Sequence, residues 1–136
     1  MAKAIGIDYG TKRVGIAISD SSKIIASALC TITNKEVFIF LIDLFKKEEI
    51  DTIVVGEAKN LDGTETDSTK DIHKFIEKLR TLFPKTEIHT IDERFTSKIA
   101  FQSIIDSGIK KNKRQNKSLI DEVSATIILQ DYLSYK

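Results

Sequence analysis

The sequence is poor in the features that cross-link a chain or anchor it in a membrane. It has one cysteine, Cys30, which cannot form an internal disulfide, and the apolar residues after it favour a core position over a nucleophilic role. The longest apolar run covers residues 37–42, far fewer than the roughly 20 residues that a membrane-spanning helix needs. No positively charged leader with a cleavable apolar segment precedes the first strand-like stretch. We therefore expect a cytoplasmic protein with no membrane partner, folded as a single domain over residues 1–136.

An overall basic charge is also missing. The formal net charge is +1 and the isoelectric point is about 7.8, whereas nucleic-acid-binding domains are usually markedly basic. The cations are nevertheless unevenly distributed, because five of them fall within the eight residues 110–117: Lys110, Lys111, Lys113, Arg114 and Lys117. Taken alone, this basic segment is as typical of a solvated loop as of a phosphate-binding surface.

The apolar periodicity alternates between that of strands and that of helices. Three strands are expected at residues 4–8, 14–19 and 24–32, with a turn at 10–13 between the first two. Asn34 is a plausible N-cap for a helix that follows, and residues 51–56 form a short β-branched run typical of a buried, parallel strand. Because this strand follows a helix, the first half of the chain predicts a meander continued by a βα unit.

The second half of the chain repeats the helix and strand pattern. Ser68 with Asp71 resembles a capping box that opens a second helix, which Pro84 terminates. A fifth strand is expected at 87–91, a third helix between Thr96 and Gly108, and a final helix beginning at Ser118. A three-strand meander followed by βα units predicts an α/β fold with a mixed five-stranded sheet and helices packed on both faces.

Three acidic positions stand out. Asp8 ends an apolar strand, where an ionised carboxylate is costly unless it is paired or bound to metal; the alternative is a turn aspartate that accepts backbone N–H bonds. Asp92 and Glu93 follow the fifth strand, where α/β sheets present their ligand sites, although acids are also favoured at helix N-termini. Asp121 is either a site residue or the acid of a capping box with Ser118.

Carboxylates gathered at one end of a sheet would repel one another. Two of them about 6 Å apart repel by roughly 3 kcal/mol at an effective dielectric constant near 20, so a cluster is stable at neutral pH mainly when a divalent cation neutralises it. Oxygen-only ligation suits Mg²⁺ or Mn²⁺, and such sites support phosphodiester hydrolysis. Zinc is not expected, because His73 and His89 have no ligand-like spacing.

Three segments carry a resemblance to a known family. Residues 6–20 (GIDYGTKRVGIAISD), 92–97 (DERFTS) and 117–130 (KSLIDEVSATIILQ) closely resemble motifs of the YqgF/RuvX family, in the same order and across nearly the whole chain. The resemblance implies a ribonuclease H-like fold related to Holliday-junction resolvases, a divalent metal, and a nuclease role in maturing the 5′ end of pre-16S ribosomal RNA. It carries Asp8, Glu93 and Asp121 over as catalytic, metal-binding acids.

The chain also departs from the family pattern. Glu57 and Ala58 follow Gly56 where the family commonly has Leu-Pro, so Glu57 is a candidate extra or substitute metal ligand. The following helix lacks the Gly-Pro-x-Ala stretch common in relatives, which leaves substrate contacts there open. Because the basic segment ends four residues before Asp121, its cations are expected beside the acids, with Lys12, Arg13 and Arg94 as further nucleic-acid contacts.

Three alternatives remain open. The substrate could be branched DNA rather than structured RNA. The Asp-x-Gly-Thr stretch at residues 8–11 also resembles the phosphate loop of the actin and Hsp70 ATPases, but those proteins use two lobes and this chain has room for one. A non-catalytic nucleic-acid-binding module is the third alternative, and the presence of all three acids argues against it.

Overall fold

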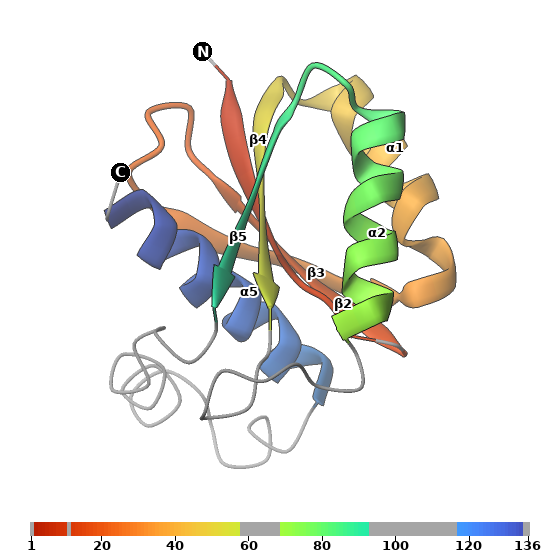
Figure 1. The fold of residues 1–136 in the computed structure, drawn as a ribbon. Helices are drawn as coiled ribbons and strands as arrows, with labels where there is room; N and C mark the ends of the chain where they lie inside the picture. The colour runs from red at the N-terminus through yellow and green to blue at the C-terminus, as the bar shows by residue number, and fades with distance from the viewer. Residues whose placement is uncertain (1, 11, 58–68, 93–116, 135–136) are drawn as a thin grey trace.

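The computed structural model describes residues 2–10, 12–57, 69–92 and 117–134 (Figure 1). Strands β1 (Lys3–Asp8), β2 (Arg13–Ser19) and β3 (Ala26–Thr33) come first, followed by a 3₁₀ turn, η1 (Asn34–Glu36), and helix α1 (Val37–Lys47). Strand β4 (Ile50–Glu57), helix α2 (Thr69–Leu82), strand β5 (Glu87–Asp92) and helix α5 (Lys117–Ser134) complete the described elements.

The five strands form one mixed sheet in the order β3-β2-β1-β4-β5. Strands β1, β2 and β3 pair antiparallel, whereas β4 pairs parallel with both β1 and β5. The predicted five-stranded α/β sheet is therefore confirmed, including the parallel pairing of the strand expected at residues 51–56. Because β1, β4 and β5 run in one direction, they end at the same edge of the sheet, which we call the carboxyl edge.

Helices cover both faces of the sheet, as predicted (Figure 1). Helices α1 and α2 cover one face, where β-branched strand residues such as Ile5, Ile7 and Val55 meet Leu41 and Leu79 in the larger core. Helix α5 covers the other face over smaller residues, including Ala4 and Ala17. The alternation of strand side chains explains this division, since successive residues of a strand point to opposite faces.

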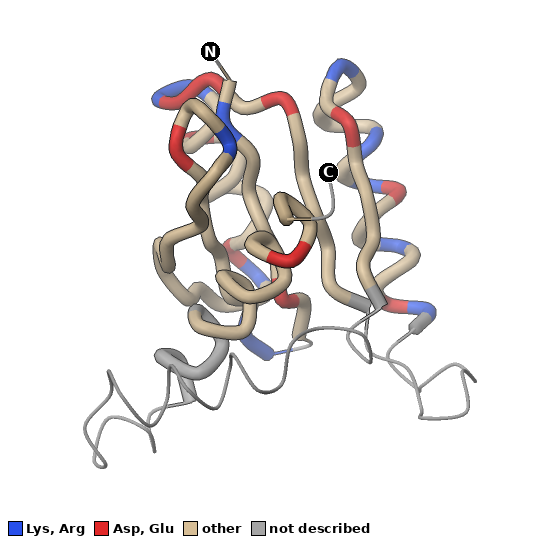
Figure 2. Tube along the Cα trace, turned by 90° about the vertical axis from the view of Figure 1, so that its left-hand side faces the viewer, with Lys and Arg blue, Asp and Glu red and all other residues tan. Residues whose placement is uncertain are grey.

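The charged residues lie on the sides of the helices that are not buried against the sheet. Figure 2 shows basic and acidic residues spaced along α2, whose apolar side is buried through Ile72, Phe75 and Leu79. From Val123 onward α5 carries one charged residue, Asp131, because most of this helix lies against the sheet. None of the described helices is both long and apolar enough to cross a membrane.

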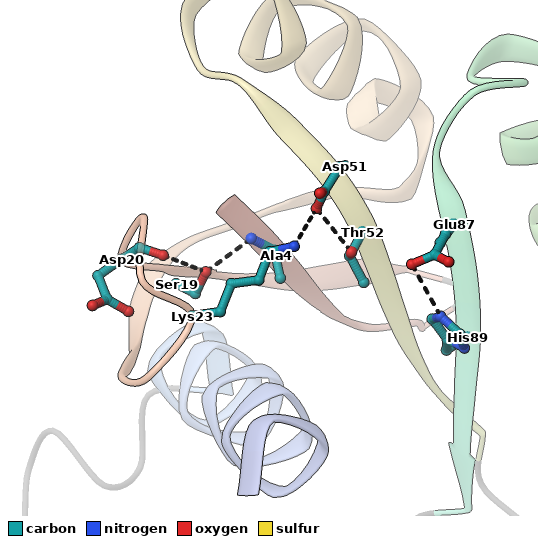
Figure 3. Close-up of polar contacts among 8 residues, drawn as sticks. All are labelled: Ala4, Ser19, Asp20, Lys23, Asp51, Thr52, Glu87 and His89. Carbon is teal, nitrogen blue, oxygen red and sulfur yellow. Dashed lines mark hydrogen bonds and ion pairs between the residues drawn. The ribbon is translucent and has the colours of Figure 1, made fainter. Parts of the chain in front are cut away.

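The amino edge of the sheet, opposite the carboxyl edge, is closed by polar contacts (Figure 3). The buried Ser19 hydroxyl accepts the backbone N–H of Ala4 at 2.8 Å and donates to the backbone carbonyl of Asp20 at 2.9 Å. Lys23 donates to the Asp51 carboxylate at 2.6 Å, and the Thr52 hydroxyl donates to the same oxygen at 2.9 Å. The side chains of Ser19, Lys23, Asp51 and Thr52 thus find their hydrogen-bond partners within the protein.

Several predicted boundaries were wrong. Strand β3 begins at Ala26 rather than at residue 24, because the backbone N–H groups of Ile24 and Ile25 bond to the Asp20 carboxylate instead of to a strand. Ile24 is 64% exposed, so its apolar character did not indicate burial. Asn34 is not an N-cap: it begins η1, and its side-chain amide donates to the carbonyl of Gly10.

The final helix also differs from the prediction. Helix α5 begins at Lys117, one residue before the predicted start at Ser118. Cys30 is half-buried in β3 and packs against the larger core, as expected. The predicted helix between Thr96 and Gly108, and the capping residue Ser68, lie outside the described residues.

Candidate active site

Asp8 is the last residue of β1 and lies at the carboxyl edge of the sheet. It is half-buried and belongs to the strand, since it pairs with residues of both neighbouring strands. Gly6, two residues earlier, faces α5, and the alternation of side chains directs Asp8 toward the same face. The carboxylate therefore stands at the end of the sheet on the side that α5 covers.

Both register partners of Asp8 are glycines. Asp8 pairs with Gly15 of β2 and with Gly56 of β4. Paired residues of adjacent strands share a face and hold their Cβ atoms about 5 Å apart, so any other residue at these positions would place a side chain against the carboxylate. Gly15 and Gly56 therefore place no side chain of their own beside Asp8.

The ends of β4 and β5 bring two further acidic positions to the same edge. The backbones of Glu57 and Asp92 are paired in register, one position beyond the Gly56 that pairs with Asp8. Glu57, the candidate substitute ligand, is thus on the strand adjacent to Asp8, whereas Asp92 is one strand further away. Glu93, the predicted second acid, lies outside the described residues, as does its neighbour Arg94.

Helix α5 begins at the carboxyl edge and runs toward the amino edge (Figure 1). Its Gln130 side chain accepts the backbone N–H of Ala26 at 2.9 Å and donates to the carbonyl of Ile24 at 3.0 Å, which ties the later turns to the β2–β3 hairpin. The backbone of Asp121 lies one helical turn before Ala125, on the same side of the helix. Since Ala125 packs against Gly6, this turn comes at the level of the Asp8 end of β1.

Close packing of α5 on β1 depends on small residues. A Cβ atom added at Gly6 would lie 2.8 Å from the carbonyl oxygen of Ala125 and closer still to Leu129. The sequence predicted this approach from the small residues after Asp121, and Ala125 is fully buried in the structure. Sequence reasoning missed the glycines on either side of Asp8, because their significance depends on strand register; it also missed the anchoring role of Gln130.

The predicted nucleic-acid contacts fall into two groups. Lys12 is exposed and Arg13 half-buried, in and after the turn that joins β1 to β2 at the carboxyl edge. Lys117 begins α5 at that edge. The other cations of the basic segment, Lys110, Lys111, Lys113 and Arg114, lie outside the described residues.

Soft metal ligands are not gathered near Asp8 in the described ranges. Cys30 packs on the α1–α2 side of the sheet, and the described side chains contain no group of three histidine, cysteine or acidic residues suited to a metal. Acidic residues end β4 and β5 at this edge, at Glu57 and Asp92, and carboxylate oxygens suit hard divalent cations.

A protein-family comparison identifies the lineage of the chain. Residues 2–135 match the model of the family described as "RuvX: Holliday junction resolvase". The chain belongs to the RuvX family. RuvX relatives include a protein of Flavobacterium psychrophilum, 52% identical over the whole chain and 99% of its own length, and one of Bacteroides fragilis, 41% identical over the same shares. Both carry the name "Putative pre-16S rRNA nuclease".

Solved structures agree on the fold of this RuvX chain. Thermus thermophilus RuvC in complex with a Holliday junction superposes with a TM-score of 0.61 at 9% identity, over 99% of this chain and 95% of that one. The fowlpox virus resolvase in complex with junction DNA gives a TM-score of 0.58 at 14% identity, over 98% and 97% of the two chains. The fold is therefore ribonuclease H-like, as the sequence motifs implied.

Proposed function

We propose that this RuvX-family chain is a metal-dependent nuclease that hydrolyses phosphodiester bonds during maturation of the 5′ end of pre-16S ribosomal RNA. The observation that carries the proposal is the placement of Asp8: an acid at the end of the central strand, flanked by Gly15 and Gly56, where β4 and β5 end and α5 begins. The RNA substrate is taken from the name of relatives that match this chain over its full length.

The proposed catalytic acids are Asp8, Glu93 and Asp121. Together they would hold Mg²⁺ or Mn²⁺, which supplies charge neutralisation at the scissile phosphate and lowers the pKa of bound water. Asp8 contributes an oxygen donor at the end of the central strand, and its register partners Gly15 and Gly56 add no side chain beside it. The pairing of β1 with β4 and the packing of α5 on β1 fix the position of the Asp8 carboxylate. Hydrolysis requires a catalytic group that is held in place in this way.

Phosphate binding is the second requirement of the proposal. Exposed Lys12 and the neighbouring Arg13 lie at the carboxyl edge, and Arg94 with the basic segment at residues 110–117 completes the proposed set of contacts. Cations near the acids would hold the backbone of the nucleic acid and fix its register. Cations gathered at one edge could bind phosphates even though the net charge of the chain is only +1.

A four-way DNA junction is the second candidate substrate. The family description names Holliday junction resolvase, and two structural neighbours are resolvases bound to junction DNA. A shared fold does not fix the substrate, so RNA and DNA have to be compared directly on the purified chain.

The decisive assay offers each substrate in parallel with Mg²⁺ or Mn²⁺. The substrates are a structured RNA with a 5′ single-stranded extension, a four-way DNA junction, and ATP. We expect metal-dependent cleavage of the RNA extension, lost in Asp8→Asn and retained in Asp43→Asn, a matched change at an exposed acid of α1. Preferential junction cleavage would favour the second candidate, and ATP turnover without strand cleavage would contradict both.

A further inference from the structure

A groove lined by aromatic and lysine side chains adjoins the carboxyl edge on the face opposite to α5. It begins at Tyr9, the residue after Asp8, whose side chain packs on the α1–α2 side of the sheet. A cavity of about 200 Å³ there is lined by Tyr9, Phe38 and Phe75 together with Lys74 and Lys78. A second, larger cavity of about 550 Å³, lined partly by Lys12 and Lys35, adjoins it, since Asn34 lines both.

Three rings, one from the turn after β1 and one each from α1 and α2, form the apolar wall of the first cavity. The ring centroids of Tyr9 and Phe75 are 4.6 Å apart, and those of Phe38 and Phe75 are 5.3 Å apart. Phe75 is buried, whereas Tyr9 and Phe38 are only half-buried and expose part of their rings. The cavity is smaller than the roughly 300 Å³ at which pockets for drug-sized ligands begin, so it suits one planar ring system rather than a whole nucleotide.

Cations border the groove on both sides. Four exposed lysines line the two cavities, against the two acids Glu36 and Asp71. The Lys78 ammonium lies 4.3 Å from the centroid of the Phe38 ring, so positive charge and aromatic surface occur together. This pairing matches the two chemical parts of a nucleic-acid strand, because bases stack on aromatic rings while phosphates contact cations.

The base of the groove is held in place. The Asn34 side-chain amide donates to the Gly10 carbonyl at 2.8 Å, and its backbone N–H donates to the carbonyl of Lys12 at 3.0 Å. These bonds attach the start of η1 to the turn after β1, which carries Tyr9. These bonds fix the groove at the end of β1, directly after Asp8 in the chain and on the face of the sheet opposite to the Asp8 side chain.

We propose that this groove binds an unpaired nucleotide of the substrate strand, across the carboxyl edge of the sheet from the bond that is cut at Asp8. The base stacks against Tyr9 and Phe38, while Lys74, Lys78 and Lys12 contact the flanking phosphates. A base that is still paired within a duplex cannot enter the cavity, so the groove selects single-stranded extensions. This inference rests on the proposed nuclease function and adds to it the kind of strand that reaches Asp8.

The test measures binding rather than cleavage, in the Asp8→Asn chain. Fluorescence anisotropy compares a single-stranded RNA oligomer with a blunt duplex of the same sequence. Phe38→Leu keeps an apolar side chain but removes the ring, and it should weaken single-strand binding about tenfold, within the range reported for loss of one stacked base. Duplex binding should stay unchanged. Phe45→Leu is the matched control, since Phe45 stacks on Phe83 at 4.1 Å near the other end of α1.

A second pair of variants tests the phosphate contacts without touching the core. Lys74→Gln with Lys78→Gln removes two exposed cations of the groove, whereas Lys46→Gln with Lys47→Gln removes two exposed cations from the end of α1. The first pair should lower the slope of log affinity against log salt by about 1.4 for single strands. The second pair should leave that slope unchanged.

The outcomes separate the groove from the nuclease proposal. Single-strand binding unaffected by Phe38→Leu and by the groove lysine pair would overturn the groove, and the nuclease proposal would stand. Equal losses on duplex and single strand would also overturn it, because selectivity for unpaired bases would be absent. A free mononucleotide that binds the groove as tightly as the oligomer would reassign it to small nucleotides. Failure of both the unmodified chain with metal and the Asp8→Asn chain to bind any nucleic acid would refute both proposals.

Discussion

Gly6 of β1 lies directly against Leu129 of α5: a Cβ atom added at position 6 would come 2.6 Å from the Leu129 Cβ. Real Cβ atoms do not approach so closely, and the same added atom would lie 2.8 Å from the Ala125 carbonyl oxygen. The contact sets the distance between the sheet and the helix, and the same helix carries Asp121 one turn before Ala125. Stability and site geometry are therefore coupled at this point.

Gly6→Ala should displace α5 and lower the free energy of unfolding by about 1–3 kcal/mol, the usual range for overpacking. Any cleavage activity should fall with it, because the first turns of α5 move relative to Asp8. Urea denaturation measures the stability, with Ser27→Thr as the control that adds one methyl group at an exposed position of β3. A Gly6→Ala chain as stable as the control would show that α5 is not tightly seated.

Metal binding by Asp8 should be visible as stabilisation. A ligand at one hundred times its Kd stabilises a fold by about 2.7 kcal/mol, so Mn²⁺ or Mg²⁺ should raise the Tm of the unmodified chain and not that of Asp8→Asn. Without metal, Asp8→Asn should be at least as stable as the parent, because it relieves repulsion among carboxylates. Thermal melting with and without Mn²⁺ tests both expectations. An equal metal-induced rise in the two chains would remove Asp8 from the metal site.

The identity of the other ligands follows from the same measurement. Glu93→Gln and Asp121→Asn should abolish the metal-induced rise in Tm, whereas Glu57→Gln should retain it. Glu122→Gln is the matched control for Asp121, being the same loss of charge one residue along α5. If Glu57→Gln is the variant that loses the response, the second ligand belongs to the end of β4, on the strand beside Asp8, and the assignment of Glu93 is wrong.

The basic segment should contribute phosphate contacts. Changing Lys110, Lys111, Lys113 and Arg114 to glutamine should weaken nucleic-acid binding and flatten its salt dependence, because fewer counterions are released. Stability should hardly change, since these residues are polar. The control removes four exposed cations elsewhere: Lys46, Lys47, Arg80 and Lys85. Identical salt slopes in the two quadruple variants would reduce the segment to a solvated loop.

Acid should loosen the β2–β3 hairpin through Asp20. The backbone N–H groups of Ile25 and Ile24 bond to its carboxylate and hold its pKa below the ordinary value of 3.8. A depressed folded-state pKa means that the stabilisation is present above 3.8 and is lost as the pH falls below it. Urea unfolding across this pH range should show the loss in the parent and a smaller pH dependence in Asp20→Asn. Ser21→Ala, an uncharged change in the same turn, should titrate like the parent.

Local patterns in the sequence were enough to determine the elements and the class of fold. Alternating apolar residues in β1 and β2, the β-branched run of β4 and the apolar stripe of α2 each encode one element through its own periodicity, so they could be identified residue by residue. The acids could be nominated for the same reason, because Asp8 stands out against the apolar strand that contains it.

The tertiary structure alone determined how distant segments of the chain are arranged relative to one another. The pairing of Asp8 with Gly15 and Gly56 depends on strand register, and the groove at Tyr9 and Phe38 depends on how α1 and α2 pack against the end of β1. Neither the strand register nor the packing of the helices can be recognised from a local periodic pattern in the sequence. The same holds for Ile24, an apolar residue that the sequence pattern placed in a strand. In the structure its backbone N–H bonds to the Asp20 carboxylate instead of to a neighbouring strand.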